Sequence, residues 1–188
     1  MKRFPLICLL VCTATVLLTS CLGENKVDNT WRKTNEAFYE QQKQRKNSDG
    51  SNYFKAVTAA WDSSAQVLVH WHNDTNLTKN NLKPLYTSTV DVKYKLNLYN
   101  GAPLDSSYKR TTPADSIFRT KLTSGSVIAG WAVALTNMHV GDSCEVVIPQ
   151  SMGYGPTTFG GIKGFSTLVF NIKLVDIAAY EKKKPTLN

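Results

Sequence analysis

Residues 125–141, GSVIAGWAVALTNMHVG, contain a short helical pattern that decides the class of the fold. Their apolar side chains recur at i, i+1, i+4, i+8 and i+11, which places them on one face of a helix. These side chains are Val127, Ile128, Trp131, Leu135 and Met138. Val140-Gly141 follows, and a glycine in this place often ends a helix. The pattern predicts a one-sided helix of about three turns, whose apolar face requires a sheet to pack against.

The chain on both sides of this helix has the period-two pattern of β-strands. In residues 90–98, VDVKYKLNL, every second residue is apolar, which is typical of a strand with one buried and one solvated face. Asn100-Gly101 follows as a strong turn signal. Further strands are predicted over residues 65–71, 117–122, 143–149 and 167–177. The sum is an α+β fold, a largely antiparallel sheet packed on one short helix.

The N-terminal part of the mature chain has a different pattern. Residues 22–30 are polar and are typical of a tether. A helical stripe follows, and its members are Val27, Trp31, Thr34 and Phe38. The stripe predicts a helix of about fifteen residues within 27–46. Residues 50–64 show no clear period, so residues 22–64 are expected to be dispensable for folding.

The first twenty residues are predicted to be a bacterial lipoprotein signal peptide. A charged start, Lys2-Arg3, precedes an apolar run over residues 4–18, which is shorter than the roughly 20 residues of a membrane span. Leu18-Thr19-Ser20-Cys21 resembles the lipobox, in which the cysteine is lipidated and becomes the mature N-terminus. The alternative is an ordinary secretory signal with an incidental cysteine. The lipobox predicts a cell-envelope protein anchored to a bacterial membrane through Cys21, with the periplasmic side of the outer membrane as the expected location.

These patterns divide the chain into four parts. They are a lipoprotein signal peptide (1–20), a lipid-anchored tether with an N-terminal helical segment (21–64), a folded domain (65–180) and a basic tail (181–188).

Composition and motifs exclude several classes of function. The 188-residue chain has a formal net charge of +8, but its basic residues are scattered apart from Lys182-Lys183-Lys184, so no nucleic-acid partner is expected. His70 and His72 have no cysteine nearby, and no metal site or cofactor is predicted. The sequence has neither a phosphate-binding glycine loop nor a nucleophile motif. Three of the four cysteines lie within residues 1–21, and the alternating pattern around the fourth, Cys144, predicts a buried strand residue.

The sequence also offers apolar and aromatic residues near predicted turns. Taken singly, each of them fits a hydrophobic core. Together they could line a concave apolar pocket with a few polar groups. The residues are Tyr94, Leu104, Phe118, Val127, Ile128, Trp131, Tyr154, Ile162 and Phe170.

Residues 90–177 resemble the FKBP family of peptidyl-prolyl cis-trans isomerases in the order and spacing of their motifs. The match begins with residues 90–94 (VDVKY, family VxVxY), 100–107 (NGAPLDSS, family DGxxFDSS) and 125–131 (GSVIAGW, family GxVIxGW). It continues through residues 135–141 (LTNMHVG), 148–155 (IPQSMGYG) and 166–170 (STLVF), which are similar to LxxMxxG, IPxxxxYG and (A/S)TLxF. The resemblance implies a twisted antiparallel sheet wrapped around one short helix.

The resemblance also implies a site. Catalytic roles would fall to Tyr94, Asp105, Trp131, Tyr154 and Phe170, and substrate-binding roles to Leu104, Phe118, Val127, Ile128 and Ile162. Trp131 would form the pocket floor, and the Tyr154 hydroxyl and the Ile128 backbone amide would be the hydrogen-bonding groups. Asp105 is expected at the pocket rim, holding Tyr94 or a nearby donor. The sequence departs from the family at Leu104, where the family usually has Phe, in extra residues around 111–116, and in residues 162–164, which read IKG where the family has IPP.

The function expected from the resemblance is isomerisation of Xaa-Pro bonds in polypeptides, assisting protein folding in the cell envelope. It requires no nucleophile, because the reaction is a rotation about an amide bond. A non-catalytic peptide-binding chaperone on the same fold is the first alternative. The second alternative is a structural envelope protein that acts through the helix at 27–46, with homodimerisation through that helix as an open expectation.

Overall fold

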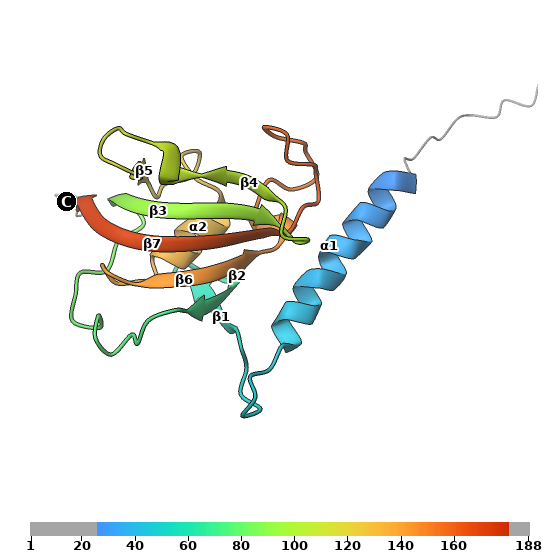
Figure 1. Ribbon diagram of the computed structural model, residues 1–188, viewed down its shortest axis with the longest axis horizontal. Coiled ribbons are helices and arrows are strands. Elements are labelled where there is room, and N and C mark those ends of the chain that lie inside the picture. Colours follow the sequence, from blue (N-terminus) through green and yellow to red (C-terminus); the bar gives the residue numbers. More distant parts are fainter. Residues whose placement is uncertain (1–25, 181–188) are drawn as a thin grey trace, which may run out of the picture.

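A computed structural model describes residues 26–180, with side chains from residue 29 onward. Seven strands form one sheet in the order β1-β2-β6-β7-β3-β4, and β5 pairs with β3 beside β4. Every strand pair is antiparallel. The strands are β1 (Lys55–Ala59), β2 (Asp62–Trp71), β3 (Thr89–Leu98), β4 (Pro103–Ser106), β5 (Phe118–Lys121), β6 (Ser143–Ile148) and β7 (Leu168–Ala179). The helices are α1 (Lys26–Gln44) and α2 (Ala129–Leu135), with short 3-10 turns η1 (Ser107–Lys109) and η2 (Gln150–Met152). The sheet curves around α2, and α1 lies outside it (Figure 1), which confirms the α+β fold.

Strand β3 shows how the alternating sequence builds the core. Its inward side chains, Val90, Val92, Tyr94 and Leu96, are all buried, while the residues between them are more polar. The strand pairs with β7 along its whole length and with β4 and β5 on its other side. Gly101, at a φ of +83°, makes the turn into β4 and donates its N–H to the Leu98 carbonyl. The predicted strand and turn are therefore confirmed.

Helix α2 is shorter than the predicted three turns. It has seven residues, and its backbone hydrogen bonds change to the i−3 pattern at Asn137 and Met138. The physical reason lies in Asn137, whose side-chain amide donates to the Val133 carbonyl, the group that the Asn137 N–H would bond in a longer helix. Ile128 caps the helix at its start.

The surroundings of α2 also differ from the one-sided pattern. Six of its seven residues are buried, so the helix is covered nearly all round. Gly130 allows the closest approach, since a Cβ there would lie 2.4 Å from Ile148 Cγ2 of β6. Cys144, on the same strand, is fully buried as predicted.

Strand β1 corrects the expected domain boundary at residue 65, which falls inside β2. β1 pairs with β2 from Lys55 opposite Val69 to Ala59 opposite Asp62. Phe54, Val57 and Ala59 are buried. Part of the segment expected to be dispensable therefore belongs to the sheet.

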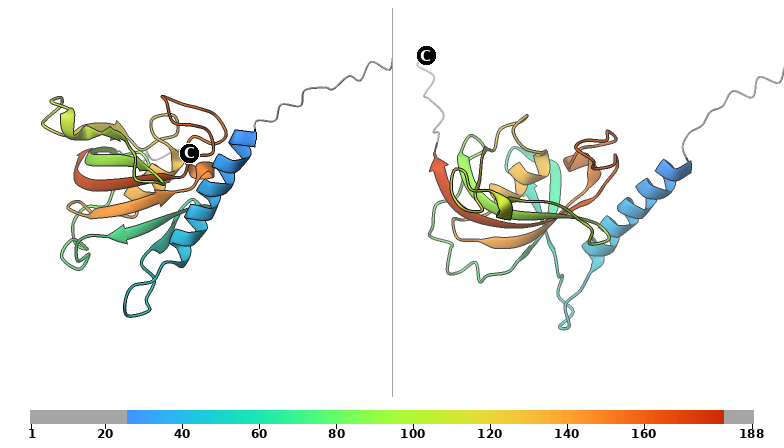
Figure 2. Two further views of the ribbon diagram at one scale, coloured as in Figure 1. Left: turned by 45° about the vertical axis from the view of Figure 1, so that its right-hand side comes forward. Right: turned by 45° about the horizontal axis from the view of Figure 1, so that its top comes forward.

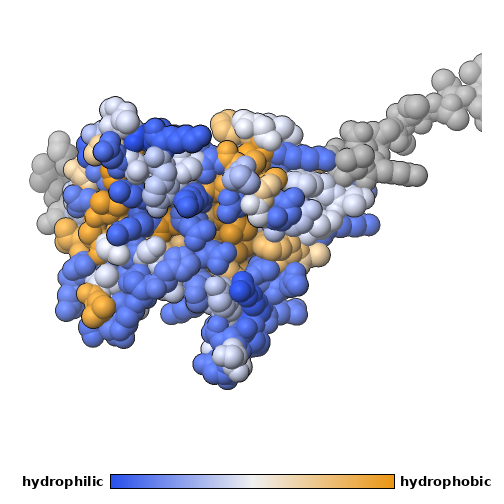
Figure 3. Space-filling view, viewed as in Figure 1, coloured by the Kyte–Doolittle hydropathy of each residue, from blue (hydrophilic) through white to orange (hydrophobic). Residues whose placement is uncertain are grey.

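Helix α1 confirms the predicted N-terminal helix, but the face that it buries differs from the predicted stripe. Trp31 and Phe38 are half-buried as the stripe requires, but Thr34 is exposed and Asn35 is fully buried. The helix packs on the outer face of the sheet through a small second core, formed by Phe54, Leu68 and Val147 with Phe38, Tyr39 and Tyr53. The helix and the sheet lie side by side in all three views (Figures 1 and 2), and Figure 3 shows apolar residues gathered beside α1 on a mostly hydrophilic face.

Neither α1 nor α2 is long and apolar enough to cross a bilayer, and no other helix of residues 26–180 is. The predicted signal peptide, Cys21, the Val27 side chain and the basic tail lie outside the part of the chain described in this detail.

Candidate functional site

A cavity of about 200 Å³ opens on the inner side of the sheet, between β3, α2 and the loop that follows η2. It contains eight of the ten site residues predicted from the sequence: Tyr94, Asp105, Phe118, Val127, Ile128, Trp131, Tyr154 and Phe170. Three further residues line it: Leu96, Arg110 and Ser126. The predicted site residues are thus mostly brought together from six separate segments of the chain.

Trp131 lies at the centre of the aromatic wall. The side chain is 4% exposed, and its ring meets Tyr94, Phe170 and Phe118 edge-on, with centroid separations of 5.1, 5.3 and 5.9 Å. Edge-to-face contacts of this kind favour fixed ring positions. The indole Nε1 is buried without a hydrogen-bond partner among the described residues. The arrangement makes a rigid and largely apolar surface.

A tyrosine–carboxylate pair lies at the rim of the cavity. The Tyr94 hydroxyl on β3 donates to Asp105 Oδ2 on β4 at 2.5 Å, as expected from the sequence. Burial, and then this hydrogen bond, raise the pKa of Tyr94 to about 12, while the nearby Arg110 acts in the opposite direction. Tyr94 is therefore neutral at physiological pH, and its hydroxyl remains the donor of the hydrogen bond to Asp105.

Arg110 adds a positive charge that the sequence analysis did not predict. It directly follows η1, between β4 and β5, and its Cζ lies 4.8 Å from the centre of the Phe118 ring. No periodic pattern covers Arg110, whereas Ser126 lies within the motif at residues 125–131 but at one of its variable positions. Leu96 could have been found, because it is the next inward position of β3 after Tyr94.

Tyr154 enters the cavity from the loop after η2. Burial, with a smaller contribution from the negative charge of Asp105, raises the pKa of its hydroxyl. Its ring stacks on Phe159 with centroids 4.8 Å apart and an interplanar angle of 13°. Phe159 is 60% exposed. Tyr154 thus gives the cavity a neutral hydroxyl donor, and Phe159 extends its aromatic surface outward.

Two predicted site residues lie outside the cavity. Leu104 is 37% exposed, because the pleat of β4 turns it to the opposite side from Asp105. Ile162 is buried in the main core, and its backbone forms two hydrogen bonds with Phe159 that pinch the loop. The motifs therefore located both residues near the cavity in the chain, but the side chains of Leu104 and Ile162 do not line it.

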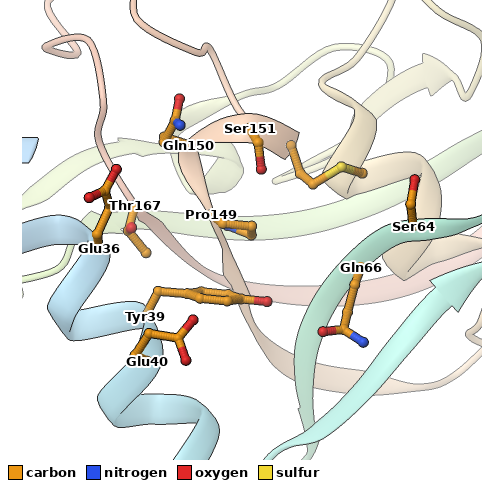
Figure 4. Close-up of a pocket in the computed structure, with 10 residues that line it drawn as sticks. Glu36, Tyr39, Glu40, Ser64, Gln66, Pro149, Gln150, Ser151 and Thr167 are labelled. Carbon is orange, nitrogen blue, oxygen red and sulfur yellow. The ribbon is translucent and has the colours of Figure 1, made fainter.

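A larger cavity of about 440 Å³ lies between α1 and η2 and shares no residue with the aromatic one. Figure 4 shows the Tyr39 ring extending from α1 toward Gln66, with Glu36 and Glu40 on the same helix and Gln150 and Ser151 opposite. Tyr39 is its single aromatic residue. This cavity lacks the enclosed rings of the cavity around Trp131.

The two histidines considered as metal ligands have structural contacts. His70 stacks on Tyr53 at 3.9 Å, and its Nδ1 lies 2.8 Å from the Tyr53 carbonyl oxygen. His72 Nε2 lies 3.0 Å from Asn171 Oδ1. Within residues 26–180 no group of three or more His, Cys, Asp or Glu side chains is placed to hold a metal ion.

Comparison with known proteins identifies the architecture. Residues 81–175 match the FKBP-type peptidyl-prolyl cis-trans isomerase domain. FK506-binding protein 2 of Aspergillus oryzae is 34% identical over 125 residues, which cover 66% of this chain and 88% of that protein. The FKBP-type 22 kDa peptidyl-prolyl cis-trans isomerase of Escherichia coli is 41% identical over 95 residues, 50% of this chain and 43% of that protein. A crystal structure of a peptidyl-prolyl cis-trans isomerase from Pseudomonas syringae superposes with a TM-score of 0.60 at 26% identity, over 80% of this chain and 96% of that one.

Proposed function

Because this chain belongs to the FKBP-type peptidyl-prolyl cis-trans isomerases, we propose that its aromatic cavity binds Xaa-Pro segments of unfolded polypeptides and accelerates their isomerisation in the bacterial cell envelope. The observation that carries the assignment is the cavity itself, in which Trp131 is enclosed by three aromatic rings beside neutral hydroxyl groups. Amide rotation needs no nucleophile, so a cavity of packed rings suits it.

The chemistry to be accelerated is a rotation. An amide bond has a barrier of about 18–20 kcal/mol, because resonance keeps it planar, and isomerisation passes through a twisted state. The planar amide is the more polar form, so water stabilises it more than it stabilises the twisted form. An apolar cavity that excludes water therefore favours the transition state over the ground state. Each tenfold acceleration requires about 1.4 kcal/mol of this difference.

The cavity residues divide this work by position. We assign the floor to Trp131, against which the proline ring would pack, and the walls to Tyr94, Phe118 and Phe170. Val127 and Ile128 complete the apolar lining before α2. Asp105 fixes the Tyr94 ring through its hydrogen bond. The Tyr154 hydroxyl, and by family resemblance the Ile128 backbone amide, would orient substrate carbonyls.

The direct test is turnover by the soluble chain lacking residues 1–21. We expect it to accelerate both a proline-limited refolding reaction and the isomerisation of a short Xaa-Pro peptide. Tyr154→Phe removes one hydrogen bond of about 0.5–1.5 kcal/mol and should lower kcat/KM by roughly two- to tenfold. Asp105→Ala should also lower it, because Tyr94 loses its partner. Tyr108→Phe is the matched control, since that tyrosine is exposed and outside the cavity.

The envelope location rests on the sequence of residues 1–21. A charged start, a short apolar run and Leu18-Thr19-Ser20-Cys21 together fit a lipoprotein signal. We therefore place the enzyme on a membrane through Cys21, on the periplasmic side of the outer membrane. Its partners would be proline-containing chains that fold there.

A non-catalytic peptide-binding chaperone is the second candidate. Two exposed apolar side chains favour it: Phe159, whose ring stacks on Tyr154 of the cavity, and Leu104 on the other side of β4. Absence of turnover on every Xaa-Pro peptide, together with suppression of aggregation of an unfolded protein, would replace the isomerase assignment by this one.

A further inference from the structure

Helix α1 is joined to the loop that carries the cavity mouth through Asn35. We define the pocket loop as residues 155–167, between Tyr154 and β7. Asn35 is fully buried, and its Oδ1 accepts the Thr167 N–H at 2.7 Å while its backbone carbonyl accepts the Thr167 hydroxyl at 2.9 Å. The Asn35 amide group donates to the Trp31 carbonyl at 2.9 Å, which fixes its orientation. Figure 4 shows Thr167 lying against α1 at the level of Glu36.

Two cation–π contacts cross the same interface in opposite directions. The Arg32 guanidinium of α1 lies 5.0 Å from the centre of the Phe165 ring in the pocket loop. The Lys163 ammonium of the pocket loop lies 5.4 Å from the Trp31 ring on α1. Contacts of this kind contribute about 0.5–1 kcal/mol each at exposed sites. Helix and loop are thus connected at several points along little more than one turn of α1.

The pocket loop is built so that its ends cannot move independently. The Phe165 N–H donates to the Gly155 carbonyl at 2.8 Å, and Phe165 has a φ of +62°, a strained conformation for a residue with a side chain. A Cβ on Gly164 would lie 2.0 Å from the Pro156 carbonyl oxygen, so the two arms of the loop are in close contact there. The Gly164 N–H donates to Thr158 Oγ1 at 3.3 Å, and the next residue, Phe159, stacks on Tyr154 of the cavity. A continuous series of contacts therefore joins Thr167 to the Tyr154–Phe159 pair.

We propose that α1 is a positioning element for the cavity and that Asn35 is its positioning residue. By binding Thr167 at the end of the pocket loop, Asn35 determines the position of the Tyr154–Phe159 pair. Tyr154 lines the cavity and the exposed Phe159 stacks on it, so a residue flanking a bound proline would meet this pair. Asn35 therefore tunes which Xaa-Pro sequences are accepted. The inference rests on the proposed isomerase function and adds a specificity determinant outside the region of the chain that carries the family motifs.

The test compares kcat/KM across a series of peptides that differ only in the residue before proline. It uses the chain lacking residues 1–21, at a temperature where circular dichroism shows every variant folded. Asn35→Ala should lower kcat/KM by roughly three- to tenfold and should change the ratios between peptides. Asn29→Ala is the matched control, because Asn29 is exposed on the same helix. It should leave both the values and the ratios unchanged.

A milder pair of variants keeps the test decisive where Asn35→Ala destabilises the protein. Thr167→Val deletes one hydrogen bond to α1 and should shift the peptide ratios in the same direction as Asn35→Ala. Thr167→Ser retains the hydroxyl and should restore the ratios of the unchanged protein. Identical ratios in all variants, with only the melting temperature lowered, would overturn the proposal and make α1 a docked tether. Absence of turnover by the unchanged protein would instead overturn the proposed function, and this inference with it.

Discussion

Trp131 belongs both to the core and to the cavity. Its ring is held by Tyr94, Phe118 and Phe170 and by its place on α2. Because the same ring fills space and faces the cavity, stability and activity are coupled at this residue. Tyr94 shows the same coupling, since it is a buried strand residue and also one half of the polar pair at the rim.

Trp131→Ala should therefore damage both properties. Truncating a buried aromatic side chain costs roughly 3–5 kcal/mol of unfolding free energy, which urea denaturation would measure. Isomerase turnover should fall below detection at a temperature where the variant is folded. Trp61→Ala is the control, since Trp61 is 50% exposed and lies away from this cavity. An unchanged melting temperature in Trp131→Ala would rule out the floor assignment.

Tyr94 should ionise late in an alkaline titration. Its pKa is raised from 10.0 to about 12 by burial and by the bond to Asp105. The stability that this group contributes is complete below pH 10 and is lost as the pH rises through 12. The ultraviolet difference spectrum between the unchanged protein and Tyr94→Phe should show a phenolate midpoint near pH 12. A midpoint near pH 10 would mean that the hydroxyl is solvated and free of Asp105.

Individual site residues were predictable to the extent that strand period and motif spacing place a side chain. Tyr94, Trp131 and Phe170 follow from such patterns. Leu104 lies outside the cavity because the neighbouring Asp105 takes the inward position on a short edge strand, a choice that pattern alone does not determine. Arg110 lies in the irregular segment between β4 and β5, where no period exists to predict it.

At the scale of elements, β1 is the part of the fold that the sequence left ambiguous. It pairs with β2 at the outer edge of the sheet and contributes Val57 and Ala59 to the main core. Its five residues, KAVTA, have too short and too mixed a pattern to distinguish a strand from a loop. The length of α2 was overestimated for a related reason: apolar spacing continues to Met138, but side-chain hydrogen bonds end the helix at Leu135.

A chain beginning at residue 65 should lose much of its stability relative to one beginning at residue 53. Removing β1 and the start of β2 exposes the partners of Val57 in the main core, and burial of such a side chain contributes roughly 1.5–3 kcal/mol. Chemical denaturation of the two truncated chains would measure the difference. Equal unfolding midpoints would show that β1 is a dispensable addition to the sheet.

At the scale of the whole molecule, the folded body, α1 and the proposed anchor form a series along the chain. α1 is docked on the body by the second core and by Asn35, so it does not act as a loose spacer. The proposed attachment point, Cys21, lies five residues before the start of this helix. Orientation of the cavity relative to the membrane would then depend on α1.

Cys21→Ala should release the protein from membranes. The prediction assumes the several acyl chains typical of bacterial lipoproteins, since a single chain binds a bilayer only marginally. Fractionation of cells producing the variant should place it in the soluble envelope fraction, with isomerase activity unchanged. Retention of the variant in the membrane fraction would contradict the lipobox interpretation.

The firm docking of α1 has a consequence for where the enzyme can work. Five residue steps from Cys21 to Lys26 reach at most about 18 Å, and the nineteen residues of α1 add about 28 Å along a helix that is fixed to the body. With Cys21 in the bilayer, the cavity could sample only a thin layer of space next to the membrane surface. Substrate chains would then be selected first by their location. A chain just emerging at the membrane meets the enzyme repeatedly, whereas the same sequence free in the bulk meets it rarely.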